Sequence, residues 1–188
     1  MKTLVCFGDS LTARKEGFEE PMLTTKLAKR LQQYEVINAG VSGDNTVDGL
    51  ERMERDVLAH KPDGVTVLFG ANDAAFHKNI SLDLYQKNLY EMVERISPEK
   101  TILISPAPVD EKVQKARTNE VLDQYAFAAA EVAKDTGCHF IDFFHQMISL
   151  DDYPVKLRGI KNDGLHFGEE GYDFLVQLIT KKIKSIRL

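Results

Sequence analysis

Four short motifs contain the residue types that acyl transfer requires. A serine hydroxyl becomes an effective nucleophile when a histidine accepts its proton, and that histidine needs a partner to fix its tautomer and stabilise its cation. The intermediate also needs hydrogen-bond donors for its oxyanion. The motifs at 8–11, 38–46, 70–73 and 163–166 supply Ser10, Gly43, Asn72, Asp163 and His166.

The spacing of these residues suggests a role for each. Asp163 lies three residues before His166, so its carboxylate can reach back to Nδ1 of the ring and leave Nε2 free for Ser10. The backbone N–H groups of Ser10 and Gly43 and the side-chain amide of Asn72 are the expected oxyanion donors. At Gly43 no side chain obstructs the N–H, and the amide of Asn72 donates without adding charge.

Short apolar runs precede three of the motifs. Residues 3–7, 65–69 and 101–105 are rich in β-branched and other apolar side chains on both faces, and 35–38 and 139–142 are shorter runs of the same kind. Strands of this type are typical of a parallel sheet that is buried on both sides.

Helical periodicity fills the segments between these runs. Gly137 is placed to end the fourth of the predicted helices. The apolar stripes are Leu23, Leu27, Leu31 and Tyr34; Val47, Leu50, Met53 and Val57; Tyr85, Leu89, Met92 and Ile96; Val121, Tyr125, Ala128 and Val132; and Leu175, Leu178, Ile179, Ile183 and Ile186.

This alternation predicts an α/β protein: a three-layer α/β/α sandwich, flavodoxin-like, with a five-stranded parallel sheet of order 2-1-3-4-5. We expect residues 1–188 to form one domain. In such sheets the ligand site lies beyond the carboxyl ends of the strands. Three of the motifs directly follow predicted strands, so this rule places the candidate site there.

Composition excludes several other functions. The net charge of -5 argues against a nucleic-acid partner. No apolar run is long enough to span a membrane, and the first strand begins almost at Met1 without a leader, so we expect a cytoplasmic protein. The predicted strand order puts Cys6 and Cys138 about 14 Å apart, too far for a disulfide. No cluster of cysteines or histidines predicts a metal site.

The four motifs together resemble the GDSL, or SGNH, hydrolase family. Ser10, Gly43, Asn72 and His166 match its four blocks, and Asp163 matches its acidic partner three residues before the histidine. The resemblance extends over nearly the whole chain. It implies a serine ester hydrolase that needs no cofactor. Residues 38–46, 69–74 and 106–108 further resemble the isoamyl-acetate-hydrolysing esterase branch.

The substrate is less defined by the sequence. No large inserted lid is present, which favours small or short-chain esters. Segments 13–20 and 151–162 should border the site. Phe18, Phe76 and Tyr153 are candidates for lining an acyl pocket, but core or surface packing is the favoured interpretation of each.

Three alternatives keep the same machinery: an acetyl-carbohydrate esterase, a thioesterase or a lysophospholipase. A fourth belongs to another class, a flavodoxin-like binding module with a vestigial triad. No Thr/Ser-rich phosphate loop follows the first strand, which argues against FMN binding.

Overall fold

A five-stranded parallel sheet forms the centre of the protein. The computed structural model describes residues 1–186 and 188, and its strand order is β2-β1-β3-β4-β5. All four neighbouring pairs are parallel. The predicted fold is therefore confirmed, with strands β1 (Lys2–Gly8), β2 (Tyr34–Gly40), β3 (Gly64–Leu68), β4 (Thr101–Ile104) and β5 (His139–Ile141).

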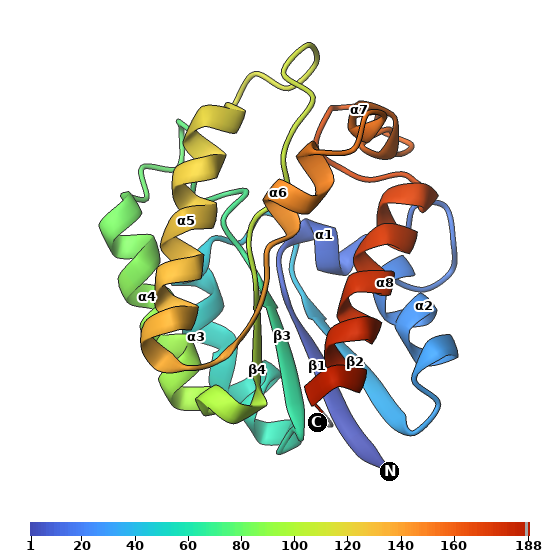
Figure 1. Cartoon of the computed structure of the whole chain (residues 1–188), viewed down its shortest axis with the longest axis vertical. Coiled ribbons are helices and arrows are strands. Elements are labelled where there is room, and N and C mark those ends of the chain that lie inside the picture. Colours follow the sequence, from blue (N-terminus) through green and yellow to red (C-terminus); the bar gives the residue numbers. More distant parts are fainter. Residues whose placement is uncertain (187) are drawn as a thin grey trace.

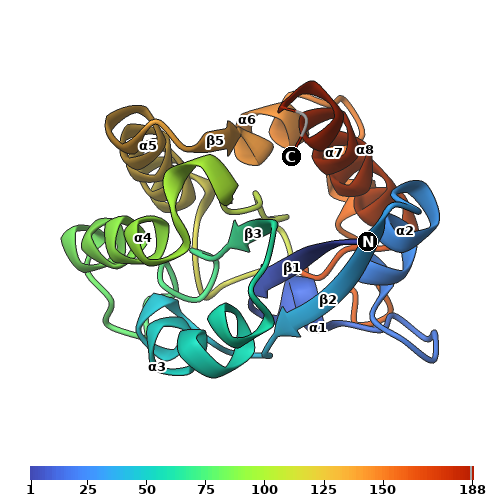
Figure 2. The same cartoon turned by 90° about the horizontal axis from the view of Figure 1, so that it is seen from below.

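Helices cover both faces of the sheet (Figures 1 and 2). α3, α4 and α5 lie against one face, and α2 and α8 lie against the other. The helices are α1 (Ser10–Ala13), α2 (Met22–Arg30), α3 (Thr46–Asp56), α4 (Leu82–Ile96), α5 (Asn119–Thr136), α6 (Phe143–Ile148), α7 (Tyr153–Lys156) and α8 (Glu169–Ile186), with 3-10 turns at Leu58–His60 and Pro98–Lys100.

The alternation of side chains along β1 explains the two cores. Val5 and Phe7 are fully buried in the core beside α3, α4 and α5, whereas Leu4 and Cys6 are fully buried in the core beside α2 and α8. Each such burial of a large apolar side chain contributes roughly 1.5–3 kcal/mol relative to exposure. A strand buried on both faces must be apolar at every position, which is the pattern that the sequence shows.

Two predicted helices are shorter than their apolar stripes: α3 ends one residue before Val57, and α2 falls further short. α2 ends at Arg30, and Tyr34 belongs to β2 instead. Leu31 leaves the helical conformation, yet both Leu31 and Tyr34 remain buried in the same core. Side chains therefore remain buried on the same side after the helix has ended. For this reason the apolar periodicity alone assigned Tyr34 to the helix, although it belongs to a strand. Gly137 ends α5 as predicted, with φ of 74°.

The two cysteines are free thiols, as predicted. Cys6 and Cys138 are both buried. Burial raises the pKa of Cys6 to about 12, so this thiol stays protonated at neutral pH. Between residues 1 and 186, no helix has the length and apolar character needed to cross a membrane.

Candidate active site

The five candidate residues lie together in one cleft. It has a volume of about 450 Å³. One of its lining residues, Ser10, begins α1, which follows β1 at the carboxyl end of that strand (Figure 1). The residues lining it are Ser10, Arg14, Ser42, Gly43, Asn72, Gln114, Ala116, Arg117, Lys161, Asp163, Leu165 and His166.

Ser10, His166 and Asp163 form a continuous chain of hydrogen bonds. Ser10 Oγ lies 2.9 Å from His166 Nε2, and His166 Nδ1 lies 2.6 Å from Asp163 Oδ2. The other carboxylate oxygen, Oδ1, accepts the N–H groups of His166 at 3.0 Å and Leu165 at 3.1 Å. The contact of the carboxylate with Nδ1 is the one that the three-residue spacing of Asp163 and His166 predicts, whereas the two backbone contacts of Oδ1 were not predicted.

Burial and charge keep this histidine in the form that accepts a proton. Burial lowers the pKa of His166, Asp163 opposes that shift, and the charges of Arg14 and Lys161 add to it. The net shift is downward, so the ring is neutral at neutral pH. Burial acts to raise the pKa of Asp163, but the hydrogen bonds from His166 and Leu165 hold it below its usual range.

A tight turn presents Ser10 at the end of β1. Asp9 caps α1 by accepting the N–H of Leu11 at 2.9 Å, which makes Ser10 the first residue of this short helix. α1 also packs directly on the end of β2, where a Cβ at Gly40 would lie only 2.5 Å from the backbone nitrogen of Ala13. The close approach of these two backbones therefore requires glycine.

Gly43 has a backbone conformation that favours glycine. Its φ is +90°, and an added Cβ would meet no protein atom within 4 Å. Glycine is therefore favoured at this position because of its positive φ, and not because a side chain would clash with the protein. Among the residues that the structure describes, its N–H donates to no protein acceptor, which leaves it free for an oxyanion.

The amide of Asn72 is held by the loop that follows β2. Its Nδ2 donates to the carbonyl of Asp44 at 2.8 Å and lies 3.5 Å from Asp9 Oδ2. The first contact fixes one N–H group, while the second is at the limit of hydrogen bonding. Burial raises the pKa of Asp9 to about 7, which lowers the negative charge near this amide. One N–H of Asn72 can therefore serve an incoming oxyanion.

The buried carboxylate of Asp73 joins the loop after β3 to the start of α3. Its Oδ1 accepts the backbone N–H of Thr46 at 3.0 Å and the Thr46 hydroxyl at 2.5 Å. Asn88 of α4 donates to the same hydroxyl at 3.0 Å. This network fixes the loop that carries Asn72.

Arg52 of α3 holds three parts of the site and was not predicted from the sequence. Its guanidinium donates to the carbonyls of Gly8 and Ala39, both at 2.8 Å, and to Asp44 Oδ2 at 2.6 Å. It also lies 4.8 Å from the ring centre of Phe7. Asp44 in turn accepts from the Asn72 amide, so Arg52 positions the expected oxyanion donor.

Replacing Arg52 by methionine should lower the free energy of unfolding by about 3–5 kcal/mol, because it leaves Asp44 and two carbonyls without their donor. Denaturant unfolding measures this change. Arg55→Met is the matched control, since Arg55 is 78% exposed and pairs only with Asp56 within the described chain; its effect should stay within about 0.5 kcal/mol. Equal losses in the two variants would contradict the positioning role.

Three cleft residues come from segments that were predicted to lie near the site without any particular residue being named. Arg14 and Lys161 belong to the segments 13–20 and 151–162, which were expected to border the site, and both line the cleft. Glu16 joins these segments by accepting from Arg14 and from the N–H of Ile160. Arg117 belongs to the long loop after β4. The carboxyl end of this strand is a predicted location for the site, but no sequence motif in the loop identifies a functional residue.

The three aromatic candidates for an acyl pocket lie outside this cleft. Phe18 and Phe76 are 55% and 59% exposed, and Tyr153 packs against the core beside α8. None of the three is among the residues lining the cleft within the described chain. An aromatic side chain near the nucleophile in sequence can point elsewhere, and ordinary packing was the correct interpretation.

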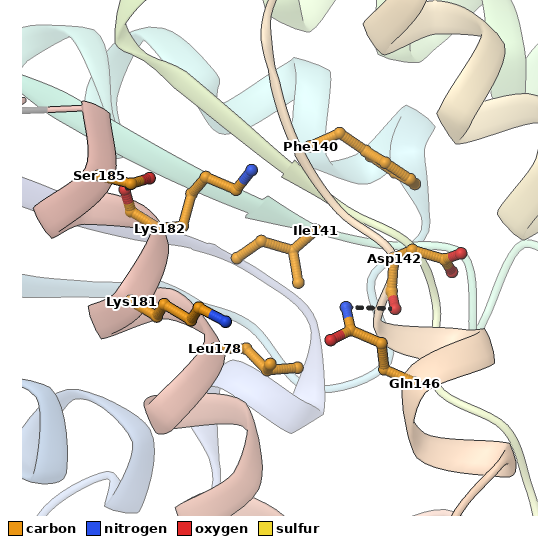
Figure 3. A pocket seen from close by; sticks show the side chains of 8 residues that line it. All are labelled: Phe140, Ile141, Asp142, Gln146, Leu178, Lys181, Lys182 and Ser185. Atoms are coloured by element: carbon orange, nitrogen blue, oxygen red, sulfur yellow. Dashed lines mark hydrogen bonds between the residues drawn. The ribbon is translucent and has the colours of Figure 1, made fainter.

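A second cavity, shown in Figure 3, has a volume of about 370 Å³ and shares no lining residue with the Ser10 cleft. It lies between β5, α6 and α8, and Gln146 Nε2 donates to the carbonyl of Asp142 at 2.9 Å there. Its lining is Phe140, Ile141, Asp142, Gln146, Leu178, Lys181, Lys182 and Ser185, and this set includes no nucleophile paired with a base. The Ser10 cleft is therefore the candidate active site.

Comparisons with known proteins show which family and fold this chain resembles. The model of the GDSL-like Lipase/Acylhydrolase family matches residues 6–174. An isoamyl acetate-hydrolyzing esterase 1 homolog from Homo sapiens is 33% identical over 98% of this chain and 84% of its own length. An acetylxylan esterase from Geobacillus stearothermophilus is 31% identical over 79% of this chain and 71% of its own. The crystal structure of the lipase/acylhydrolase from Enterococcus faecalis superposes with a TM-score of 0.91 at 35% identity, covering 98% of this chain and 96% of that one.

Proposed function

Because the chain belongs to the GDSL-like lipase/acylhydrolase family, we propose that it cleaves carboxylic esters of small acyl groups through an acyl-enzyme on Ser10. The observation that carries the proposal is the chain of hydrogen bonds from Ser10 Oγ through His166 to Asp163, at 2.9 and 2.6 Å. A neutral histidine in this position can take the serine proton as the hydroxyl attacks.

The reaction would proceed in two halves. Ser10 Oγ attacks the ester carbonyl while its proton moves to His166 Nε2, and Asp163 stabilises the resulting imidazolium. The N–H groups of Ser10 and Gly43 and the amide of Asn72 bind the oxyanion. His166 then gives its proton to the leaving alcohol, and in the second half it takes a proton from the water that attacks the acyl carbon and returns it to Ser10.

The walls of the cleft favour a small acyl group. Of the residues lining it, only Ala116 and Leu165 contribute apolar side chains. A long acyl chain needs a large apolar lining to offset the ordering of its many bonds. The relatives described above are named for isoamyl acetate and for acetylxylan, both of which are acetyl esters.

A panel of p-nitrophenyl esters tests the proposal. We expect the highest kcat/KM for acetate and a steady fall through butyrate, octanoate and palmitate, because the cleft offers little apolar surface. Activity that rises with chain length would contradict the small acyl site. No release of p-nitrophenol above the Ser10→Ala variant on any ester would contradict ester hydrolysis of this kind.

An acetylated carbohydrate is the second candidate substrate. It is favoured by the polar cleft and by the similarity to the structure of a mutant acetyl-xylooligosaccharide esterase, which superposes with a TM-score of 0.78 at 26% identity. Acetate release from acetylated xylo-oligosaccharides, compared with that from isoamyl acetate, separates the two substrates.

Replacing Asn72 by alanine should lower kcat on p-nitrophenyl acetate by about 10²–10³-fold with little change in KM, because an oxyanion donor acts mainly in the transition state. Steady-state kinetics at several ester concentrations separate the two constants. An effect confined to KM would indicate that Asn72 binds the ground state and would contradict its role as oxyanion donor.

The pH dependence of kcat/KM should reflect the pKa of His166, which the neighbouring charges shift. Activity falls as the ring is protonated, so the acid limb of kcat/KM should lie below the ordinary histidine pKa of about 6.5. Removing the cation in Lys161→Gln should move this limb to higher pH. Removing the carboxylate in Asp163→Asn should move it to lower pH and also slow the reaction.

Both shifts are measured with a neutral ester, so that substrate charge does not interfere. Lys87→Gln, an exposed lysine of α4, is the charge-matched control and should leave the limb in place. Shifts in the same direction for Lys161→Gln and Asp163→Asn would contradict the assignment of the acid limb to His166.

A further inference from the structure

Arg117 is a buried cation in the wall of the Ser10 cleft, and it forms no ion pair with any residue that the structure describes. The residue is only 4% exposed, and its buried Nε has no hydrogen-bond partner in the described chain. Burial lowers the pKa of Arg117, and the charges of Asp9 and Asp163 partly oppose this shift from a distance. The guanidinium thus lies near carboxylates without being held by them.

An arrangement of this kind costs stability unless a ligand completes it. Buried charges in folded proteins are normally paired or hydrogen-bonded. A guanidinium carries five N–H donors in a fixed plane, which match the oxygens of a carboxylate or phosphate. Arg117 therefore has the chemistry of an anion-binding residue, and it lines the same cleft as the nucleophile.

Two further cations share this cleft. Arg14 and Lys161 both line it, and the charge of each lowers the pKa of His166, which places them near the imidazole. The only carboxylate among the lining residues of the described chain, Asp163, is already bound to His166. Glu16 pairs with Arg14, whereas Arg117 and Lys161 form no ion pair within the described chain. The cleft of this protein of net charge -5 therefore keeps an excess of positive charge, which attracts anions.

The position of these cations relative to His166 indicates which part of the substrate they meet. His166 must protonate the leaving oxygen of the ester, so the leaving alcohol lies on the side of the imidazole. Arg14 and Lys161 line the cleft that contains His166, and their charges act on its imidazole, so both lie within electrostatic reach of the leaving alcohol. A negative group on the alcohol would then reach the cations, while the acyl group faces the oxyanion donors.

We infer that the ester this enzyme cleaves carries an anionic group such as a carboxylate on its leaving alcohol, and that Arg117, with Arg14 and Lys161, binds that group. The inference rests on the proposed ester hydrolysis for its catalytic consequence. It adds a substrate class that the acyl preference alone does not define.

A matched pair of acetyl esters tests the inference: 4-acetoxybenzoate, whose leaving phenol carries a carboxylate, and its neutral methyl ester. Arg117→Gln should raise KM for the carboxylate ester about 10- to 100-fold, because a charged hydrogen bond is lost. Lys161→Gln should raise it about 2- to 5-fold, as expected for an exposed cation. Neither variant should change KM for the methyl ester to a comparable extent.

Lys87→Gln serves as the control for the removal of one positive charge. If Arg117→Gln lowers kcat/KM by the same factor for both esters, the role of Arg117 is merely structural and the inference is overturned. An unchanged KM for the carboxylate ester in Arg117→Gln would overturn it as well.

A binding measurement separates this inference from the proposed function. Calorimetry with 4-hydroxybenzoate and its methyl ester reports anion binding without any turnover. If no ester is hydrolysed but the carboxylate binds to the wild-type chain and not to Arg117→Gln, the hydrolytic proposal fails and the anion site stands. If wild type binds the two phenols equally, the anion site is overturned whatever the activity.

Discussion

Replacing Ser10 by alanine is expected to lower kcat on p-nitrophenyl acetate by about 10⁶-fold. The hydroxyl of Ser10 lies 2.9 Å from the imidazole of His166 and is the nucleophile of the proposed reaction. Without it no acyl-enzyme can form, and the remaining rate reflects only binding and the oxyanion donors. A burst-free progress curve at high enzyme concentration measures the residual rate.

Ser149→Ala is the matched control for this change. Ser149 is exposed and follows α6, where its hydroxyl donates to the carbonyl of Gln146. Its replacement removes the same atom far from the cleft and should leave kcat unchanged. Turnover by Ser10→Ala close to that of Ser149→Ala would contradict a serine nucleophile at this position.

Replacing His166 by alanine should have a loss of similar size, about 10⁶-fold in kcat. Ser10 and His166 act as one unit, because the hydroxyl attacks only as the ring accepts its proton. The double variant Ser10→Ala/His166→Ala should consequently be hardly slower than either single variant. Steady-state kinetics of all three proteins measure this coupling.

His77→Ala is the control for loss of an imidazole. His77 lies five residues after Asn72 in the sequence, but it is exposed and does not line the cleft in the described chain. Near-normal kcat is expected for this variant. Losses that simply multiply in the double variant would show that Ser10 and His166 act independently, against the proposed mechanism.

Much of the fold could be predicted because its signals are local. A strand buried on both faces is apolar at each position, and β1 shows this from Leu4 to Phe7. Parallel strands separated by helices leave few topologies, so the sheet order followed. The end of a helix is a weaker signal, since Tyr34 kept the helical spacing after the backbone had become a strand.

The candidate site could be located because its residues lie in short motifs at strand ends. Asp163 and His166 are three residues apart, so their contact was accessible from spacing alone. Arg52 and Arg117 were not accessible in this way. Arg52 meets Gly8 across 44 positions of the chain, and Arg117 joins the cleft through a long loop. Only the folded backbone brings such residues to the site.

Covalent labelling of Ser10 is the most direct test of the central claim. A small alkyl fluorophosphonate should lose fluoride to the Ser10 hydroxyl, whose proton passes to His166, and leave one phosphonyl group on that oxygen. Mass spectrometry of the intact protein and of its peptides should find a single label, on Ser10, and none in Ser10→Ala. A label on another residue, or an unlabelled and fully active wild-type protein, would contradict the account.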